Sequence, residues 1–164
     1  MTEPHRIDAA NFAFIGDATD EPGSRFYLRG FIGSWLEWAV QGRTFPAISA
    51  ALAYLLENVP QGETTGLVWN DARMGNTLFV DDLSVAALLD FEVASLGPPE
   101  IDLTWWLYCE DLFSVQFAIE RLAGIPSAED AIAGFEELYG RAMPEFAYYL
   151  AIAALKHAVL SIHD

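Results

Sequence analysis

The 164-residue sequence is poor in basic residues, and this shortage limits the partners that it can have. It contains 8 lysine and arginine residues against 24 aspartate and glutamate residues, for a formal net charge of -16. Nucleic-acid backbones and anionic lipids repel such a chain, so we expect no nucleic acid and no membrane as partner. The charge has two open interpretations, a solvated acidic surface or an attraction for a polycationic substrate.

Cysteine and long apolar runs are also scarce. The single cysteine, Cys109, excludes an internal disulfide, and its place in the run WWLYC predicts a buried thiol rather than a nucleophile. The longest apolar run, residues 146–155, is too short to span a bilayer. The first 17 residues lack the apolar core of a secretory signal. These absences predict a cytoplasmic protein.

Core-forming residues are plentiful, because 53% of the sequence is apolar and 13% is aromatic. This composition predicts one folded domain, which we place at residues 25–164, preceded by an N-terminal arm or truncated edge at 1–24. Apolar residues recur at helical spacing in two early segments, which are predicted helices: Leu28, Phe31, Ile32, Trp35, Leu36 and Ala39, then Ile48, Ala51, Leu52, Leu55, Leu56 and Val59.

In the middle of the chain, the helical spacing of apolar residues gives way to short apolar runs. Short apolar runs, GLVWN, TLFV and SVAALLD, predict strands, and Asp81 with Asp82 between two of them predicts a hairpin turn. After Gly97-Pro98-Pro99 the helical pattern returns, with helices expected at about 100–122, 128–140 and 144–162. The expected fold class is therefore α+β, mainly α, with a small β-hairpin cluster.

A site pattern lies within this cluster, in the run WNDARMGNTLFVDDLSVAALLDFE. Asp71 and Asn76 are five residues apart, and Asp90 follows the next predicted strand. A loop carboxylate can accept a proton from a hydroxyl, while an amide oxygen and a second carboxylate can share a magnesium ion. Because magnesium with few protein ligands completes its shell with phosphates, the pattern indicates nucleotide chemistry. The alternative is a polar hairpin whose acids are surface turn residues, as Asp81 and Asp82 are expected to be.

The same run resembles kinase-like enzymes, in which D-x-x-x-x-N is followed by a D-F-x turn about twenty residues after the first aspartate. More narrowly, WNDARMGN and LDFEVASLGPPEIDLTWW are similar to the aminoglycoside phosphotransferase family, and to its branch related to the kinase domains found with acyl-CoA dehydrogenases. The likeness covers most of residues 25–162. It implies the C-terminal lobe of the protein-kinase-like fold.

The resemblance also implies roles for individual residues. Asp71 is implied as catalytic base or orienter of the substrate hydroxyl, and Asn76 and Asp90 as the residues that hold Mg²⁺ and, through it, ATP. Arg73 either neutralises charge on the transferred phosphate or forms a plain salt bridge within the loop. Asp102 either braces the catalytic loop from beneath or is simply an acid at a helix N-terminus.

Three positions near the motif need comment. Trp69 replaces the histidine of the commoner H-G-D motif and is expected in the core. Asn70 departs from the family's glycine, so that it either alters the loop or adopts the backbone conformation that asparagine tolerates. Glu92 follows the branch, with no role that we can assign.

Two parts of a kinase are missing. There is no G-x-G-x-x-G loop, and the only lysine, Lys156, lies far downstream of the motif. We therefore expect that the N-terminal ATP-clamping lobe is absent from this sequence and that the chain alone binds ATP poorly. Its uncovered apolar surface should favour dimerisation or aggregation.

The predicted function is ATP-dependent phosphorylation of a small-molecule hydroxyl. The substrate is left open among an aminoglycoside, a sugar, a choline-like alcohol and a hydroxyacyl thioester, the last slightly favoured by the branch resemblance. The first rival hypothesis is a non-catalytic binding module derived from a kinase-like lobe. The second is a fragment whose missing lobe exists on a longer chain.

Overall fold

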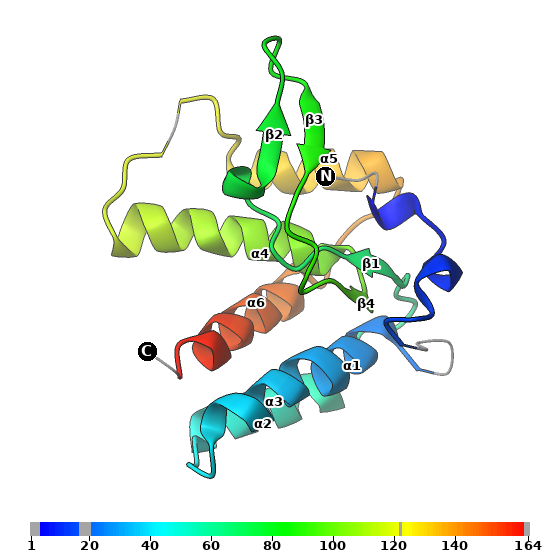
Figure 1. Cartoon of the computed structure of the whole chain (residues 1–164), viewed down its shortest axis with the longest axis vertical. Helices are drawn as coiled ribbons and strands as arrows, with labels where there is room; N and C mark the ends of the chain where they lie inside the picture. Colours follow the sequence, from blue (N-terminus) through cyan, green and yellow to red (C-terminus); the bar gives the residue numbers. More distant parts are fainter. Residues whose placement is uncertain (1–3, 17–20, 122, 163–164) are drawn as a thin grey trace.

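The computed structural model describes residues 4–16, 21–121 and 123–162. They form a mainly helical fold with two small antiparallel sheets, as the sequence predicts (Figure 1). The helical elements are η1 (Pro4–Arg6), η2 (Ala9–Phe12), α1 (Gly23–Tyr27), η3 (Leu28–Ile32), α2 (Gly33–Val40), α3 (Pro46–Glu57), η4 (Met74–Asn76), α4 (Glu100–Asp111), η5 (Leu112–Gln116), α5 (Ala128–Tyr139) and α6 (Phe146–Leu160). The strands are β1 (Gly66–Val68), β2 (Thr77–Phe79), β3 (Val85–Leu88) and β4 (Ser95–Gly97). Within the described ranges, no helix has the length and apolar character needed to cross a membrane.

An antiparallel pair of helices forms one side of the core. α1, the π-turn η3 and α2 follow one another without a break, and the left-handed backbone of Gln41 ends α2. α3 begins with Pro46 at its first turn, where a missing N–H costs nothing. The apolar stripes of these helices pack against α6 in one cluster, which confirms the two early helices expected from periodicity.

Helix α4 lies in the middle of the molecule. Nine of its twelve residues are buried, because α6 packs on one side and α5 on another. The predicted extension of this helix to residue 122 is wrong: a π-turn ends it at Gln116, and Ala118 then adopts a left-handed backbone with φ of 52°. An L-residue in that conformation cannot continue a right-handed helix.

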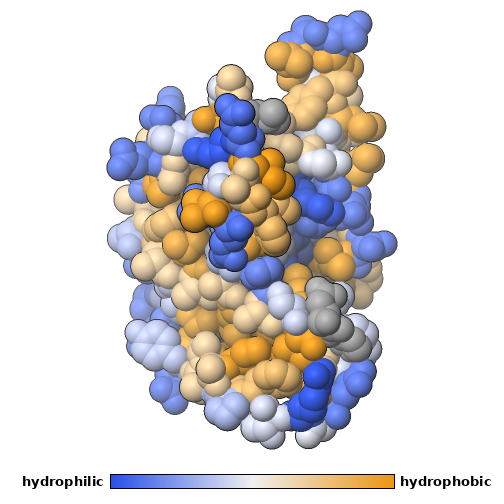
Figure 2. All heavy atoms as spheres, turned by 90° about the vertical axis from the view of Figure 1, so that its left-hand side faces the viewer, coloured by the Kyte–Doolittle hydropathy of each residue, from blue (hydrophilic) through white to orange (hydrophobic). Residues whose placement is uncertain are grey.

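The four strands form two separate pairs. β1 and β4 pair antiparallel, with Leu67 opposite Leu96, and every residue of both strands is buried. β2 and β3 form the predicted hairpin, which turns at the exposed Asp81 and Asp82. Figure 2 shows this hairpin as a projection at the top of the molecule, apolar along its sides and polar at its tip. The loop that contains Asp71 joins buried strand β1 to the hairpin strand β2. The turn that contains Asp90 joins hairpin strand β3 to buried strand β4.

The N-terminal segment, predicted as an arm, packs on the rest of the chain in its described part. The turns η1 and η2 contact β1, and Pro4 is buried. A Cβ at Gly66 would lie 3.1 Å from the carbonyl oxygen of His5, so the glycine permits this close approach. The domain boundary at residue 24 stays a prediction, and residues 1–3 and 17–20 of the expected arm lie outside the described residues.

Candidate functional site

The loop between β1 and β2 presents Asp71 in a defined orientation. Its Oδ2 atom accepts hydrogen bonds from Asn76 Nδ2 at 2.5 Å and from Arg73 Nε at 2.9 Å, and the Arg73 Nη2 atom is also 2.9 Å away. Within the described part of the chain, no hydrogen bond is made to Asp71 Oδ1. The side chain is 21% exposed. One carboxylate oxygen is therefore fixed by the loop and the other is left to accept a proton from a ligand.

Asn76 connects Asp71 to the residues that follow β3 at the base of the hairpin. Its amide nitrogen also donates to the Asp71 carbonyl oxygen at 3.2 Å, which leaves the amide oxygen Oδ1 outside these contacts. The Asn76 carbonyl oxygen accepts a hydrogen bond from Leu89 N at 2.9 Å, and Asp90 directly follows Leu89 in the chain. Asp90 has a left-handed backbone with φ of 65° and an exposed side chain. The backbone thus brings the two loops together, while a shared cleft for the Asp90 carboxylate stays a prediction.

The oxygens of Asn76 and Asp90 suit a hard cation. Amide and carboxylate oxygens are the ligands that Mg²⁺ takes in proteins, usually one or two of them together with water and phosphate. Among the described residues, no group of three or more His, Cys, Asp or Glu side chains could hold a metal by itself. A cation here would therefore need further oxygens from a ligand. The donor set fits Mg²⁺ bound with phosphate, and the metal assignment stays a prediction.

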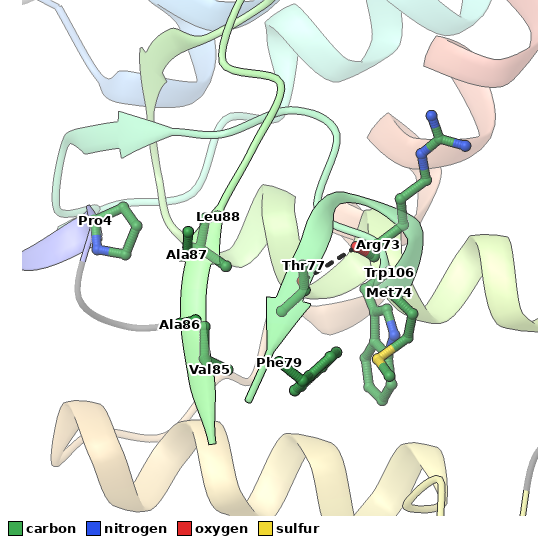
Figure 3. Close-up of a pocket in the computed structure, with 10 residues that line it drawn as sticks. All are labelled: Pro4, Arg73, Met74, Thr77, Phe79, Val85, Ala86, Ala87, Leu88 and Trp106. Carbon is green, nitrogen blue, oxygen red and sulfur yellow. Dashed lines mark hydrogen bonds between the residues drawn. The ribbon is translucent and has the colours of Figure 1, made fainter. Parts of the chain in front are cut away.

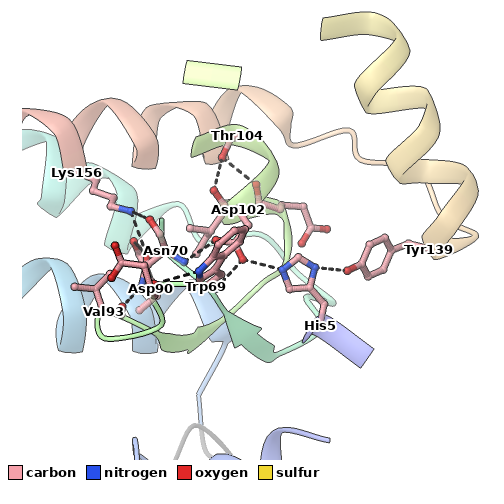
Figure 4. Close-up of polar contacts among 12 residues, drawn as sticks. His5, Trp69, Asn70, Asp90, Val93, Asp102, Thr104, Tyr139 and Lys156 are labelled. Carbon is pink, nitrogen blue, oxygen red and sulfur yellow. Dashed lines mark hydrogen bonds and ion pairs between the residues drawn. The ribbon is translucent and has the colours of Figure 1, made fainter. Parts of the chain in front are cut away.

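Asp102 holds the start of the loop from inside the molecule. It is 1% exposed, and its two oxygens accept from the backbone N–H groups of Trp69 at 2.7 Å and Asn70 at 2.8 Å (Figure 4). These are the hydrogen bonds expected if this aspartate braces the loop, and the carboxylate faces the interior rather than water. Its contribution to catalysis stays a prediction.

His5 is a partner of Asp102 that the sequence did not reveal. Its Nε2 atom lies 2.8 Å from Asp102 Oδ2, and its Nδ1 atom lies 2.5 Å from the Tyr139 hydroxyl oxygen. If Nε2–H donates to the carboxylate, Nδ1 of the neutral ring accepts a hydrogen bond from the Tyr139 hydroxyl. The two residues of the first pair are 97 positions apart, and no spacing rule connects them. The contact links the N-terminal segment to α4 and α5.

Asn70, for which the resemblance leads us to expect glycine, has a backbone conformation that asparagine tolerates. Its φ is 69°, in the left-handed region that asparagine tolerates better than most residues. Its side chain is also used: Oδ1 accepts from the Tyr27 hydroxyl at 2.6 Å, and Nδ2 donates to the Val93 carbonyl at 2.7 Å. The positive φ agrees with the tolerated conformation, and an effect of the side chain on the course of the loop stays a prediction.

Asn70→Ala should destabilise the fold by about 3 kcal/mol, since it strains a left-handed position and leaves the buried Tyr27 hydroxyl without its acceptor. Asn70→Gly is the matched variant, because it loses the same hydrogen bonds without the strain. We expect Asn70→Gly to be the more stable of the two by about 1 kcal/mol in urea unfolding. Equal stabilities would show that the backbone conformation of residue 70 relaxes in the variants.

Trp69 and Cys109 are core residues, as expected. Trp69 is 1% exposed, stacks on Phe91, and donates from Nε1 to the carbonyl oxygens of Leu89 at 2.7 Å and Asp90 at 3.1 Å. It therefore also ties the loop to the end of the hairpin. Burial raises the pKa of the Cys109 thiol to about 11, which keeps it neutral and unreactive. Glu92 is exposed, and nothing in the structure explains it.

A cavity of about 520 Å³ lies against the hairpin beside this loop (Figure 3). Thr77 and Leu88 are paired across the hairpin and both line the cavity, and α4 contributes Trp106 to the lining. The Arg73 guanidinium points away from the other lining side chains (Figure 3). The full lining is Pro4, Arg73, Met74, Thr77, Phe79, Val85, Ala86, Ala87, Leu88 and Trp106. Of the candidate site residues, Arg73 contributes to the lining, and Asp71, Asn76 and Asp90 do not.

Comparison with known proteins identifies relatives of this chain. A model described as the phosphotransferase enzyme family matches residues 4–149. The chain is similar in structure to a protein from Ralstonia eutropha JMP134 described as a candidate aminoglycoside phosphotransferase, with 24% identity and a TM-score of 0.68, over 98% of this chain and 51% of the other. A thermostable mutant of aminoglycoside phosphotransferase APH(4)-Ia matches with 21% identity and a TM-score of 0.47, over 84% of this chain and 45% of the other. The chain thus spans about half the length of the solved structures that it matches.

Proposed function

The chain belongs to the phosphotransferase enzyme family, and from this premise we propose that it carries the hydroxyl-activating and metal-binding half of an ATP-dependent phosphotransferase. The observation that supports the proposal most directly is the state of Asp71. Its Oδ2 atom is held by Arg73 and Asn76, and its Oδ1 atom is left for a ligand. A fixed and partly exposed carboxylate of this kind suits a base that acts on a substrate hydroxyl.

In the proposed reaction, Asp71 Oδ1 accepts the hydrogen bond of the substrate hydroxyl and orients its oxygen toward the phosphate to be transferred. Transfer of a phosphoryl group depends mainly on positioning and charge neutralisation, so an oriented hydroxyl is the main contribution of this residue. Asn76 Oδ1 and the Asp90 carboxylate would hold Mg²⁺, which when bound neutralises phosphate charge. Arg73 is exposed and keeps Asp71 in place through the salt bridge, and its second proposed role is to meet the transferred phosphate.

The proposal places the base of ATP against the hairpin. Leu78 lies opposite Ala87 in the register, on the face of the hairpin away from Thr77 and Leu88. Leu78 is 50% exposed, and Leu89, which continues the same alternation, is 43% exposed. Leu89 also donates its N–H to Asn76. An apolar face next to the proposed metal ligands supports nucleotide binding, because a nucleobase can stack on it.

The proposal requires residues outside this sequence to hold the phosphates of ATP. The only lysine of the chain is buried beneath the loop, so it cannot reach the phosphates of ATP from the solvent side. We propose that an N-terminal ATP-clamping lobe lies outside these residues and that this chain is the C-terminal lobe. The branch related to acyl-CoA dehydrogenases remains our proposal for its subfamily, which favours a hydroxyacyl thioester as substrate.

Weak, magnesium-dependent binding of ATP is the expected result of titration calorimetry on this chain. Asn76→Ala and Asp90→Ala should each weaken binding by about tenfold or more in the presence of Mg²⁺, because each removes one of two protein ligands. Binding measured with EDTA should not distinguish the variants from the parent chain. If ATP binds equally well with and without Mg²⁺, the proposed metal site is wrong.

The reaction itself is tested by a coupled ADP-release assay with an aminoglycoside, a sugar, choline and a hydroxyacyl thioester. A non-catalytic binding module is the second candidate, favoured by the exposed apolar side chains along the hairpin, which include Leu78, Phe79, Val80, Leu83 and Val85. ADP release that depends on one of these substrates supports the enzyme. Tight binding of a substrate without ADP release supports the binding module.

A further inference from the structure

Lys156 is the only lysine in the chain, and helix α6 carries it into the interior. The residue is 4% exposed. Its Nζ atom donates to the carbonyl oxygen of Asn70 and lies 3.4 Å from Asn70 Oδ1. The same atom is 3.8 Å from the centre of the Trp105 ring. Figure 4 shows the side chain reaching from α6 to the loop.

The surroundings of this ammonium group are unusual for a structural charge. Among the residues that the structure describes, Lys156 makes no ion pair. Burial lowers its pKa to about 8, and the charges of Asp102, Asp71 and Cys109 act in the opposite direction. Burying a lysine without an ion pair is costly, and an apolar residue of similar size is often at least as stable at such a position. A role in stability therefore does not explain why a lysine is here.

The contacts of Asn70 supply an explanation. Its backbone N–H donates to Asp102 Oδ1 and its carbonyl oxygen accepts from Lys156, so that α4 and α6 hold this one residue at both of its backbone polar groups. Between them the backbone is left-handed, with φ of 69°. The peptide group that contains this carbonyl is the one that leads into Asp71, and its orientation decides where the Asp71 side chain leaves the loop.

We propose that Lys156 is a positioning residue that aims Asp71 at the substrate by holding the carbonyl of Asn70 from inside the molecule. The proposal rests on the function proposed above for Asp71. Lys156 itself touches neither substrate nor nucleotide. Its positive charge also lies on the inner side of the loop, where it attracts the Asp71 carboxylate.

Lys156→Met separates positioning from stability, because methionine fills a similar volume without the charge or the donor. In hydrogen exchange measured by mass spectrometry, we expect amides of residues 69–72 to exchange about tenfold faster or more, as for the loss of a charge-assisted hydrogen bond. Amides of 149–155 in the core should change less than threefold. Lys156→Arg, which keeps a positive donor, should restore most of the protection of the loop. A uniform change in loop and core, or none, would overturn the proposal.

A second measurement needs no variant at Lys156. Because the chain has one lysine, labelling with ¹³C,¹⁵N-lysine gives a single side-chain signal, whose titration midpoint we expect near 8. Asp71→Asn should lower this midpoint, since the Asp71 charge raises it, and Asp90→Asn should leave it unchanged. A midpoint that does not respond to Asp71→Asn would mean that the two groups are not coupled, and the proposal would fail.

These readouts do not require turnover, so the two proposals can fail separately. Faster loop exchange in Lys156→Met, together with an Asp71-dependent lysine signal, supports positioning even in a protein that transfers no phosphate. Turnover that is lost in Asp71→Asn but unchanged in kcat in Lys156→Met would retain the proposed function and remove the positioning role.

Discussion

Asp71→Asn should lower the turnover number by about a thousandfold, with little change in the affinity for magnesium and ATP. Asparagine has the shape of aspartate and can keep contact with Arg73 through its amide oxygen, but it cannot take up the hydroxyl proton. General-base groups contribute about 10²- to 10⁴-fold to catalysis, and an oriented hydroxyl adds to that figure. The loss should appear in kcat rather than in the KM for ATP, because Asp71 is not a proposed metal ligand.

The measurement is ADP release by the longest form of the protein that turns over the chosen substrate. Asp111→Asn is the matched control, because it makes the same substitution at the exposed end of α4, a residue that the proposed reaction does not use. We expect it to retain the activity of the parent protein. Activity in Asp71→Asn equal to that of the control would remove Asp71 from the mechanism.

Activity of the chain without any upstream segment is expected to be small. The phosphate-clamping groups of a kinase are not found in this sequence, and positioning of ATP contributes much of the rate in this chemistry. Robust turnover by these 164 residues alone would show that an unrecognised part of the chain, or a second copy of it, completes the nucleotide site.

Much of the fold follows from local patterns. The helical spacing of apolar residues located α2, α3, α5 and α6, because each of these helices buries one side against the core. The hairpin followed from short apolar runs around Asp81 and Asp82. The end of the central helix was missed, because apolar residues such as Phe117 and Ile119 continue the pattern there although they are exposed. Apolar character alone does not show whether a segment has anything to pack against.

In the candidate site, too, a local sequence pattern identifies some of the residues and misses others. The motif predicts Asp71, Asn76 and Asp90 as site residues, and the Leu89–Asn76 backbone hydrogen bond brings their two loops together, while their roles stay predictions. His5 and Lys156 could not be found by this reasoning. His5 contacts Asp102, 97 residues away, and Lys156 contacts the loop residue Asn70, 86 residues away. Such contacts depend on how α4, α6 and the N-terminal turns pack, which no local pattern specifies.

Asp102→Asn should reduce the free energy of unfolding by about 4 kcal/mol, because it weakens the hydrogen bonds to a buried carboxylate and leaves at least one buried donor without an acceptor. Three N–H groups, from His5, Trp69 and Asn70, converge on its two oxygens. An amide offers one oxygen, and its NH₂ group would face one of these donors, so that at least one buried N–H loses its acceptor.

Asp111→Asn is the matched control for urea unfolding, because it makes the same substitution at the exposed end of the same helix. Its effect should stay within about 0.5 kcal/mol. A domain of this size typically has about 5–15 kcal/mol of stability, so Asp102→Asn should remain folded while the loop that starts at Trp69 loses protection first. If Asp102→Asn were as stable as the control, the buried carboxylate would not be what holds the loop, and its hydrogen bonds would have to be replaced by water.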